Sequence, residues 1–242
     1  ASVKRISELL DAKQDVIDRE DVKPLKNIRG DIEFKNVSFR YPGTQGEPVL
    51  KNINLKINQG ETLAIIGATG CGKTSMIQLI PRFYEPTEGE VLVDGINVND
   101  MKLTQLRKNI GLATQDVLLY SDTIDGNIAY GDSSLTKEEV EKFAKYSAAA
   151  KFITRMPEGY DTIVGERGVG LSGGQKQRIS LARALAVKPA ILILDDTTSA
   201  VDMETEKQIQ HSLNELDFPC TKIIIAQRIS TPKFEDKILI IQ

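Results

Sequence analysis

The chain has 242 residues, of which 40% are hydrophobic and 27% charged, and this composition supports a sizeable folded core and excludes disorder as the default state. The net charge of −3 and the absence of a basic run make nucleic acid an unfavourable partner. The longest apolar runs, residues 63–66, 191–194 and 223–226, are far shorter than the roughly 18 residues that a membrane-spanning helix needs.

The first residues predict a helix followed by two paired strands. Apolar residues recur at helical spacing over residues 1–18, and a charged stretch, residues 15–26, then acts as a linker. From residue 31 the pattern changes to alternation, which indicates strands over 31–39 and 49–57 joined by a turn rich in Gly and Pro. We expect these strands to belong to a small antiparallel sheet.

The remaining chain alternates between strand and helix patterns. Residues 62–66 are a short apolar run typical of a buried central strand. Thr136 and Glu139 are spaced as a capping box. The later segments are a helix over 136–150, a helix from Ser172 to Ala186, a strand over 191–194, a helix around 204–216 and strands over 223–226 and 238–241. This order predicts an α/β fold with a mostly parallel sheet, a small antiparallel β subdomain and an inserted α-helical subdomain. Because the chain stops directly after its last strand, we expect its C-terminus to be truncated.

A glycine-rich motif follows the predicted strand at residues 62–66. Residues 67–74 fit G-x-x-x-x-G-K-S/T between a strand and a helix, which is the context that a P-loop requires, so the core is predicted to be of the P-loop NTPase type. Glycines let backbone N–H groups surround phosphates, and the N-terminus of the helix adds partial positive charge. Lys73 would neutralise the β and γ phosphates, and Thr74 would offer a hydroxyl to Mg²⁺. The alternative is a glycine turn with an incidental lysine. The motif predicts that ATP is bound by Gly67, Ala68, Thr69, Gly70, Cys71, Gly72, Lys73, Thr74 and Ser75.

Two cysteines lie in unrelated contexts. Cys71 is within the P-loop and Cys220 precedes a predicted strand, without the C-x-x-C spacing of zinc or redox sites. This usage, and the lack of a secretory leader in the sequence, favour a reducing, cytosolic compartment. We expect Cys71 to be an inert packing residue; the alternative is a thiol whose pKa is lowered by the helix N-terminus and whose alkylation blocks ATP.

Two carboxylates, Asp195 and Asp196, end the predicted strand over 191–194. Taken alone, such a pair most often caps a helix. With a P-loop upstream, however, we expect Asp195 to hold Mg²⁺ through its waters.

A third motif, Leu171-Ser172-Gly173-Gly174-Gln175, lies about a hundred residues after the P-loop. With it, the chain resembles the nucleotide-binding domain of ATP-binding-cassette (ABC) transporters over residues 31–242. The resemblance implies that the signature residues Ser172, Gly173, Gly174 and Gln175 bind the ATP held by another subunit.

The resemblance extends to further positions along the chain. It implies that Tyr41 stacks on adenine, that Gln115 senses Mg²⁺, and that residues 199–202, including Asp202, form an interface loop. Glu166 lies in a segment similar to the exporter branch, where it contacts the coupling helices of the membrane domains. Residues 1–30 then correspond to the lead-in helix and linker from such a domain, and residues 116–186 to the helical subdomain.

The sequence departs from the family pattern at two chemical positions. Asp196 stands where the family has the Glu that orients attacking water, and Gln227 stands where it has the switch histidine. The only histidine, His211, is expected on a helix surface. A shorter carboxylate and an amide that cannot become cationic indicate a site that holds ATP but hydrolyses it slowly. With an intact signature, this pattern favours a heterodimer whose partner cassette retains the Glu and His.

The leading hypothesis is therefore an ATP-binding, energy-coupling domain at the cytoplasmic face of the cell membrane, attached to the transmembrane domains of an exporter. The alternative is a self-sufficient ABC ATPase that uses Asp196 as its base. A third hypothesis, a chromosome- or translation-associated cassette ATPase, requires a long coiled-coil insertion or a second cassette, and neither is present in this sequence.

Overall fold

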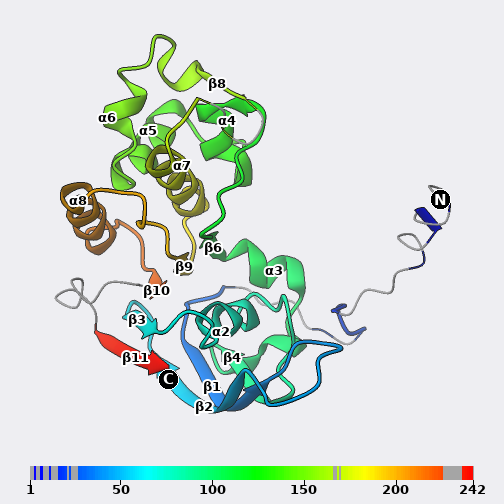
Figure 1. Cartoon of the computed structure of the whole chain (residues 1–242). Helices are drawn as coiled ribbons and strands as arrows, with labels where there is room; N and C mark the ends of the chain where they lie inside the picture. Colours follow the sequence, from blue (N-terminus) through cyan, green and yellow to red (C-terminus); the bar gives the residue numbers. More distant parts are fainter. Residues whose placement is uncertain are drawn as a thin grey trace.

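The computed structural model describes residues 3, 6, 7, 11, 16–20, 22, 27–165, 168, 170–225 and 236–241 (Figure 1). Most of the expected lead-in helix lies outside the described residues. Glu166 and Gln227 also lie outside them. Among the residues that are described, no helix is both long and apolar enough to cross a membrane.

A four-stranded antiparallel sheet has the order β2-β1-β4-β5. Its strands are β1 (Ile32–Phe39), β2 (Leu50–Ile57), β4 (Glu88–Val93) and β5 (Ile96–Asn97). The first two pair as the alternation predicted, whereas the sequence pattern did not reveal β4 and β5.

A five-stranded parallel sheet has the order β11-β3-β10-β9-β6. Its members are β3 (Thr62–Gly67), β6 (Ile110–Ala113), β9 (Ile191–Asp195), β10 (Thr221–Ile225) and β11 (Lys237–Ile241). Because the strands are parallel, the carboxyl ends of β3 and β9 lie at the same edge, which brings the glycine-rich loop and the two aspartates together.

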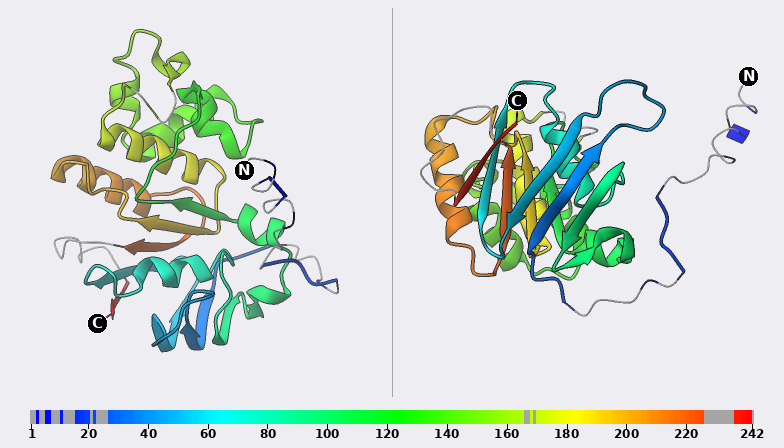
Figure 2. Two further views of the ribbon diagram at one scale, coloured as in Figure 1. Left: turned by 45° about the vertical axis from the view of Figure 1, so that its right-hand side comes forward. Right: turned by 90° about the horizontal axis from the view of Figure 1, so that it is seen from below.

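The helices divide between the two sides of the parallel sheet. Three of them, α4 (Ile124–Ile128), α5 (Lys137–Tyr146) and α6 (Ala150–Ile153), gather with the long helix α7 (Gly173–Ala186) on one side. The same region contains a short two-stranded sheet and two 3₁₀ helices, which are β7 (Asp122–Thr123), β8 (Ile163–Val164), η2 (Ala129–Gly131) and η3 (Gly159–Asp161). Figures 1 and 2 show this helical group on one side of β9 and strands β1 and β2 on the other. The other helices are α2 (Lys73–Leu79), α3 (Leu103–Lys108) and α8 (Met203–Asn214).

Two hydrophobic clusters meet at β9. Ile191 and Ile193 belong to the cluster between the two large sheets and α2, whereas Leu192 and Leu194 belong to the cluster around the helices. Successive side chains of a strand point to opposite faces, so one strand contributes to both clusters. All four side chains are buried, and this explains why the sequence shows a continuous apolar run.

Capping residues mark the starts of helices α5 and α7. Thr136 and Glu139 form the predicted capping box of α5, and Ser172 and Gln175 form one at α7. The helix expected to reach residue 150 ends at Tyr146 instead, because Ala148 has a left-handed φ of 56° that an α-helix does not accommodate. A new short helix, α6, begins at Ala150.

Candidate functional site

The loop between β3 and α2 depends on its glycines. Gly70 and Gly72 have φ angles of 84° and 100°, which residues with a side chain rarely adopt. A Cβ at Gly67 would lie 2.4 Å from the carbonyl oxygen of Ile241, in the edge strand β11. The observed loop conformation therefore requires glycine at all three positions.

Lys73, the first residue of α2, spans the base of this loop. Its Nζ donates hydrogen bonds of 2.7 Å to the carbonyl oxygens of Gly67 and Ala68. The ammonium group is thus held by neutral acceptors of the loop, and it can exchange them for charged phosphate oxygens, which form stronger hydrogen bonds.

Thr74 and Asp195 connect the loop to the end of β9. The Thr74 hydroxyl donates a 2.9 Å hydrogen bond to Oδ2 of Asp195. Asp195 is only 6% exposed. Burial raises the pKa of Asp195, although the Thr74 hydrogen bond and the Lys73 charge partly oppose this shift. A hydroxyl beside a carboxylate that lacks solvation is an oxygen donor set suited to Mg²⁺, which takes one or two carboxylates together with substrate phosphates and water.

Asp196 follows Asp195 in a strained backbone conformation. Its φ is 51°, and the residue is 8% exposed. Its N–H donates to the carbonyl oxygen of Ile225 at the end of β10, at 3.3 Å. Left-handed conformations of residues other than glycine persist only where the surroundings fix them, and they are common at functional sites.

Tyr41 forms the opposite part of the site with its ring fixed by neighbours. It packs edge-on against Phe39 and Tyr84, with ring centroids 4.9 and 5.1 Å away. Its hydroxyl shares a 2.8 Å hydrogen bond with Oγ of Ser75. The Ser75 hydroxyl is therefore engaged with Tyr41, a contact that the expected role of Ser75 at a phosphate did not include.

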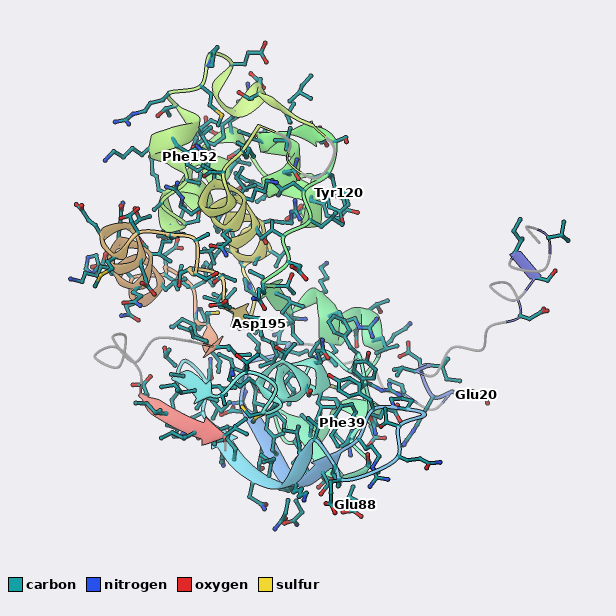
Figure 3. The ribbon with its side chains drawn as sticks, viewed as in Figure 1. Glu20, Phe39, Glu88, Tyr120, Phe152 and Asp195 are labelled. Carbon is teal, nitrogen blue, oxygen red and sulfur yellow. The ribbon has the colours of Figure 1, made fainter. Side chains whose placement is uncertain are left out.

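A cavity of about 330 Å³ joins these groups, a volume in the range of small-molecule sites. Its position at the carboxyl end of β9 is marked by Asp195 in Figure 3. It unites residues that are far apart in the sequence and that the motifs singled out: Tyr41, Thr69, Gly70, Gly72, Lys73, Thr74, Ser75, Gln115, Asp195 and Asp196. Two apolar residues that the motifs did not include, Val49 and Ile225, complete the lining.

The signature residues do not line this cavity. Ser172 caps α7 by accepting a hydrogen bond from the N–H of Gln175, and the Gln175 side chain accepts one from the N–H of Ser172, at 3.3 and 2.9 Å. Gly174 lies against the turn after β9, since a Cβ there would be 2.6 Å from the carbonyl oxygen of Ala200. The helix N-terminus at Ser172 is thus built by local caps and small residues.

Asp202 caps helix α8. It accepts hydrogen bonds from the N–H and the hydroxyl of Thr205, at 2.9 and 2.8 Å, and these bonds hold the pKa of Asp202 below its usual value. The carboxylate therefore has a structural function in the single chain, in addition to the interface role that we expect for it. His211 lies on the same helix with its side chain exposed, as predicted.

Gln177 is a residue of this region that the motifs missed. It lies on α7 and is 6% exposed, and its amide bonds to the turn that carries Asp196. Gln177 lies in the polar sequence Gln-Lys-Gln beside the signature, which is typical of a solvated helix surface. The sequence therefore gives no signal that this glutamine is buried against the turn.

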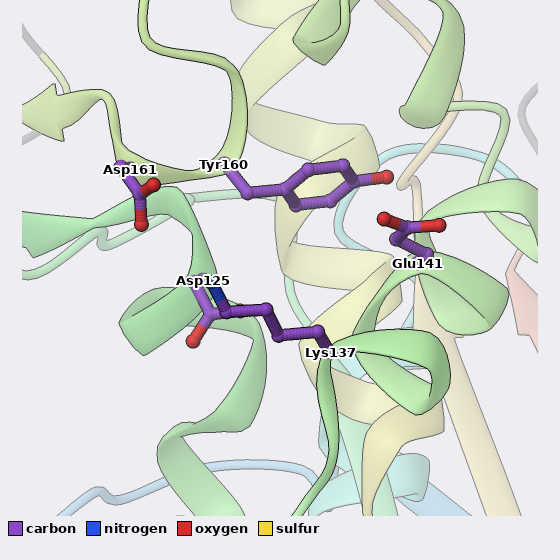
Figure 4. Close-up of a pocket in the computed structure, with 5 residues that line it drawn as sticks. All are labelled: Asp125, Lys137, Glu141, Tyr160 and Asp161. Carbon is purple, nitrogen blue, oxygen red and sulfur yellow. The ribbon is translucent and has the colours of Figure 1, made fainter.

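A second cavity of about 170 Å³ lies among α4, α5 and η3 (Figure 4). Burial, followed by the charge of Asp161, raises the pKa of Asp125, and burial raises the pKa of Tyr160 to about 12. Lys137 and Glu141 complete its lining. None of the residues that the motifs singled out belongs to this cavity.

Comparison with known proteins identifies the family. The ABC transporter family model matches residues 50–199. The chain belongs to the ABC transporter family. It is 44% identical, over its whole length, to an ATP-dependent lipid A-core flippase of Syntrophus aciditrophicus, of which it covers 40%. It is 47% identical, over 98% of its length, to a putative multidrug export ATP-binding/permease protein of Staphylococcus aureus, of which it covers 41%.

A solved structure agrees with these sequence matches. The chain superposes on a bacterial Atm1-family ABC exporter with ATP bound, with a TM-score of 0.92 and 39% identity, over 99% of this chain and 42% of that one. The chain thus spans about two fifths of the length of these relatives. Family and fold agree with the expected α/β fold of an ABC-type ATP-binding domain.

Proposed function

We propose that the chain is the ATP-binding, energy-coupling domain of an ABC exporter and that its 330 Å³ cavity holds ATP with Mg²⁺. The observation that carries this proposal is the convergence of Lys73, Thr74 and Asp195 on one cavity next to the glycine-rich loop. Two of the relatives, the lipid A-core flippase and the putative multidrug export ATP-binding/permease protein, support the exporter assignment. We place the domain at the cytoplasmic face of the membrane, beside transmembrane domains, and its boundaries at residues 31–242.

The residues of the cavity would divide the work of binding. Lys73 would exchange its bonds to loop carbonyls for the β and γ phosphates, and Tyr41 would stack on the adenine. Thr74, Gln115 and Asp195 would hold Mg²⁺, which supplies charge neutralisation for the triphosphate. The positive charge beside Asp195 would also offset the cost of burying that carboxylate.

A second cassette would complete the site. The signature residues Ser172, Gly173, Gly174 and Gln175 are absent from the lining of this chain's own cavity, although a helix N-terminus with glycines is suited to bind a γ-phosphate. We infer that they serve the ATP of a partner cassette and that Asp202 contributes to the shared interface. Glu166 would contact the transmembrane domains.

Two substitutions support an impaired site in this chain. Asp196 replaces the Glu of the family pattern, and Gln227 replaces the histidine. We infer that this site binds ATP and hydrolyses it slowly, and that the fast site is the one that the partner's P-loop forms with this chain's Ser172. A heterodimer follows, because a symmetric dimer would have two slow sites.

The test of nucleotide binding is the variant Lys73→Ala in this chain without its partner cassette, because the partner's P-loop would also bind ATP. ATP with Mg²⁺ at about 100 times its Kd would raise the melting temperature of the wild type by about 6 °C through mass action. Lys73→Ala should lose this rise, whereas Lys151→Ala, which removes an exposed lysine on α6, should retain it. An unchanged rise in Lys73→Ala would refute the assignment of the P-loop.

The test of the slow site is the double variant Asp196→Glu with Gln227→His. Hydrolysis by the assembled pair should increase, because both groups that the family uses would be restored. An unchanged rate would show that other residues limit the site. The alternative, a self-sufficient ATPase, predicts steady turnover by this chain without a partner and loss of that turnover in Asp196→Asn.

A further inference from the structure

The turn after β9 is held from two sides. On one side the N–H of Asp196 donates to the carbonyl oxygen of Ile225, at 3.3 Å. On the other, the carbonyl oxygen of Asp196 accepts from Oγ of Ser199 at 3.1 Å and from Nε2 of Gln177 at 3.4 Å. These contacts surround the one residue of the cavity lining, Asp196, that combines a side chain with a left-handed φ of 51°.

Both the nitrogen and the oxygen of the Gln177 side-chain amide form hydrogen bonds with this turn. Nε2 also donates to Oγ of Ser199 at 3.1 Å, while Oε1 accepts from the N–H of Ala200 at 3.1 Å. A buried amide satisfied by three atoms of one turn fixes that turn's shape, because moving the turn would leave polar groups unpaired away from water. No carboxylate can reproduce the contacts, since a carboxylate has no donor for the Asp196 carbonyl.

The same face of α7 carries the signature. Gly174 and Gln177 are three residues apart and thus lie on one side of the helix. A Cβ at Gly174 would lie 2.6 Å from the carbonyl oxygen of Ala200, so the helix backbone directly touches the turn. The end of α7 that Ser172 caps is therefore joined to the turn that carries Asp196 by a backbone contact and an amide.

We propose that Gln177 is a positioning residue: its amide holds Asp196 at the cavity and keeps the Ser172 end of α7 in register with it, an inference that rests on the proposed function of that cavity. Gln177 does not line the cavity and acts through Asp196 and Ser172. Its removal should therefore affect turnover and leave the affinity for nucleotide intact.

Two substitutions separate this role from simple packing. Gln177→Met keeps the length of the side chain and removes all three polar contacts. Gln177→Glu keeps an acceptor for the N–H of Ala200 and removes the donors to Asp196 and Ser199. A displacement near 1 Å at a reacting group costs roughly a hundredfold in rate, so a partial loosening should cost roughly tenfold.

The experiment measures kcat and KM for ATP hydrolysis by the full transporter, with this chain and its partner cassette present. Gln177→Met and Gln177→Glu should each lower kcat by roughly tenfold while KM changes by less than about twofold. Gln208→Met, on the exposed face of α8, should behave as the wild type. Equal kcat values in wild type and both Gln177 variants would overturn the inference, as would a rise in KM that accounts for the whole loss.

A third variant keeps the inference testable if a Gln177 variant folds poorly. Ser199→Ala removes the hydroxyl that links Gln177 to Asp196, and the double variant with Gln177→Met should lose no more activity than the more impaired single variant. Multiplying losses would overturn the inference. A wild-type transporter that neither binds nor hydrolyses ATP would instead refute the proposed function, and so the two failures are distinguishable.

Discussion

At the scale of single residues, the buried carboxyl of Asp195 is a group whose charged form a bound cation would stabilise. Burial raises the pKa of this carboxyl, and only the Thr74 hydrogen bond and the Lys73 charge lower it. The charged form is therefore less stable in the folded chain than in the unfolded chain when no metal is present. A bound divalent ion would reverse this penalty, and this links metal affinity to the burial of one side chain.

The variant Asp195→Asn tests that link. Because the folded-state pKa is raised, the chain without nucleotide loses stability as pH rises from the pKa of Asp195 in the unfolded chain through its pKa in the folded chain. Asparagine has no charge to bury, so Asp195→Asn should raise the melting temperature above this pH range and leave it unchanged below the range. The further stabilisation by ATP with Mg²⁺ should disappear.

The control for this prediction is Asp116→Asn, a change of an exposed carboxylate in the loop after Gln115. It should leave the melting temperature without nucleotide unchanged. A fall of several degrees in Asp195→Asn would show that the Asp195 charge stabilises the empty site, contrary to this account.

At the scale of elements, the packing of α7 against the turn after β9 requires glycine at one position and not at its neighbour. A Cβ at Gly174 would lie 2.6 Å from a backbone oxygen of Ala200, whereas a Cβ at Gly173 would make an ordinary 3.4 Å contact with the Ala200 side chain. Packing against the turn therefore requires glycine at position 174 and does not require it at position 173.

These glycines form a matched pair for mutagenesis. Gly174→Ala should lower the free energy of unfolding by about 1–3 kcal/mol, because the backbone of the turn has to move away. Gly173→Ala should change it by less than about 0.5 kcal/mol. Urea unfolding of the two variants measures the difference, and equal values would show that the turn yields easily.

The elements differed in how far the sequence predicted them. The capping box at Thr136 and the N-cap residue Ser172 predicted the starts of α5 and α7, because caps are local. Strand β6 was missed because it has only four residues and contains Gly111. That glycine is explained by tertiary packing, since a Cβ there would be 2.3 Å from the carbonyl oxygen of Ala184 in α7.

The candidate site was predictable where its residues are close in sequence or end a strand. The P-loop spacing and the acidic pair assigned Thr74 and Asp195 to one expected Mg²⁺ site, and the two side chains lie within hydrogen-bond distance of each other. The hydrogen bond between Tyr41 and Ser75 and the contacts of Gln177 were not predictable, because both depend on which segments meet in space. Local sequence patterns carry no information about such tertiary contacts.

At the scale of the whole molecule, the proposed function divides nucleotide binding between two parts of this chain that do not meet. One is the cavity around Lys73, and the other is the helix end at Ser172, which has no place in that cavity. A head-to-tail pair with a second cassette would complete both parts. ATP would then lie between the two cassettes and stabilise their association.

Ser172→Ala tests this arrangement, with Thr136→Ala as its control. Each variant removes the cap of a capping box and should cost about 1 kcal/mol of stability. Only Ser172→Ala should also reduce hydrolysis by the assembled pair, and ATP binding to this chain should be retained. Equal losses of hydrolysis in both variants, or an equal loss of binding, would refute the crossed arrangement.

Strand β9 has apolar side chains on both faces, with isoleucines toward one hydrophobic cluster and leucines toward the other. A shift of one residue would exchange Ile193 and its neighbour Leu194 without exposing either to water, so hydrophobicity alone gives little protection against misalignment. The same shift would break the bond between Thr74 and Asp195. The polar end of the strand, which lines the cavity, therefore also favours the observed alignment of β9 over the shifted one.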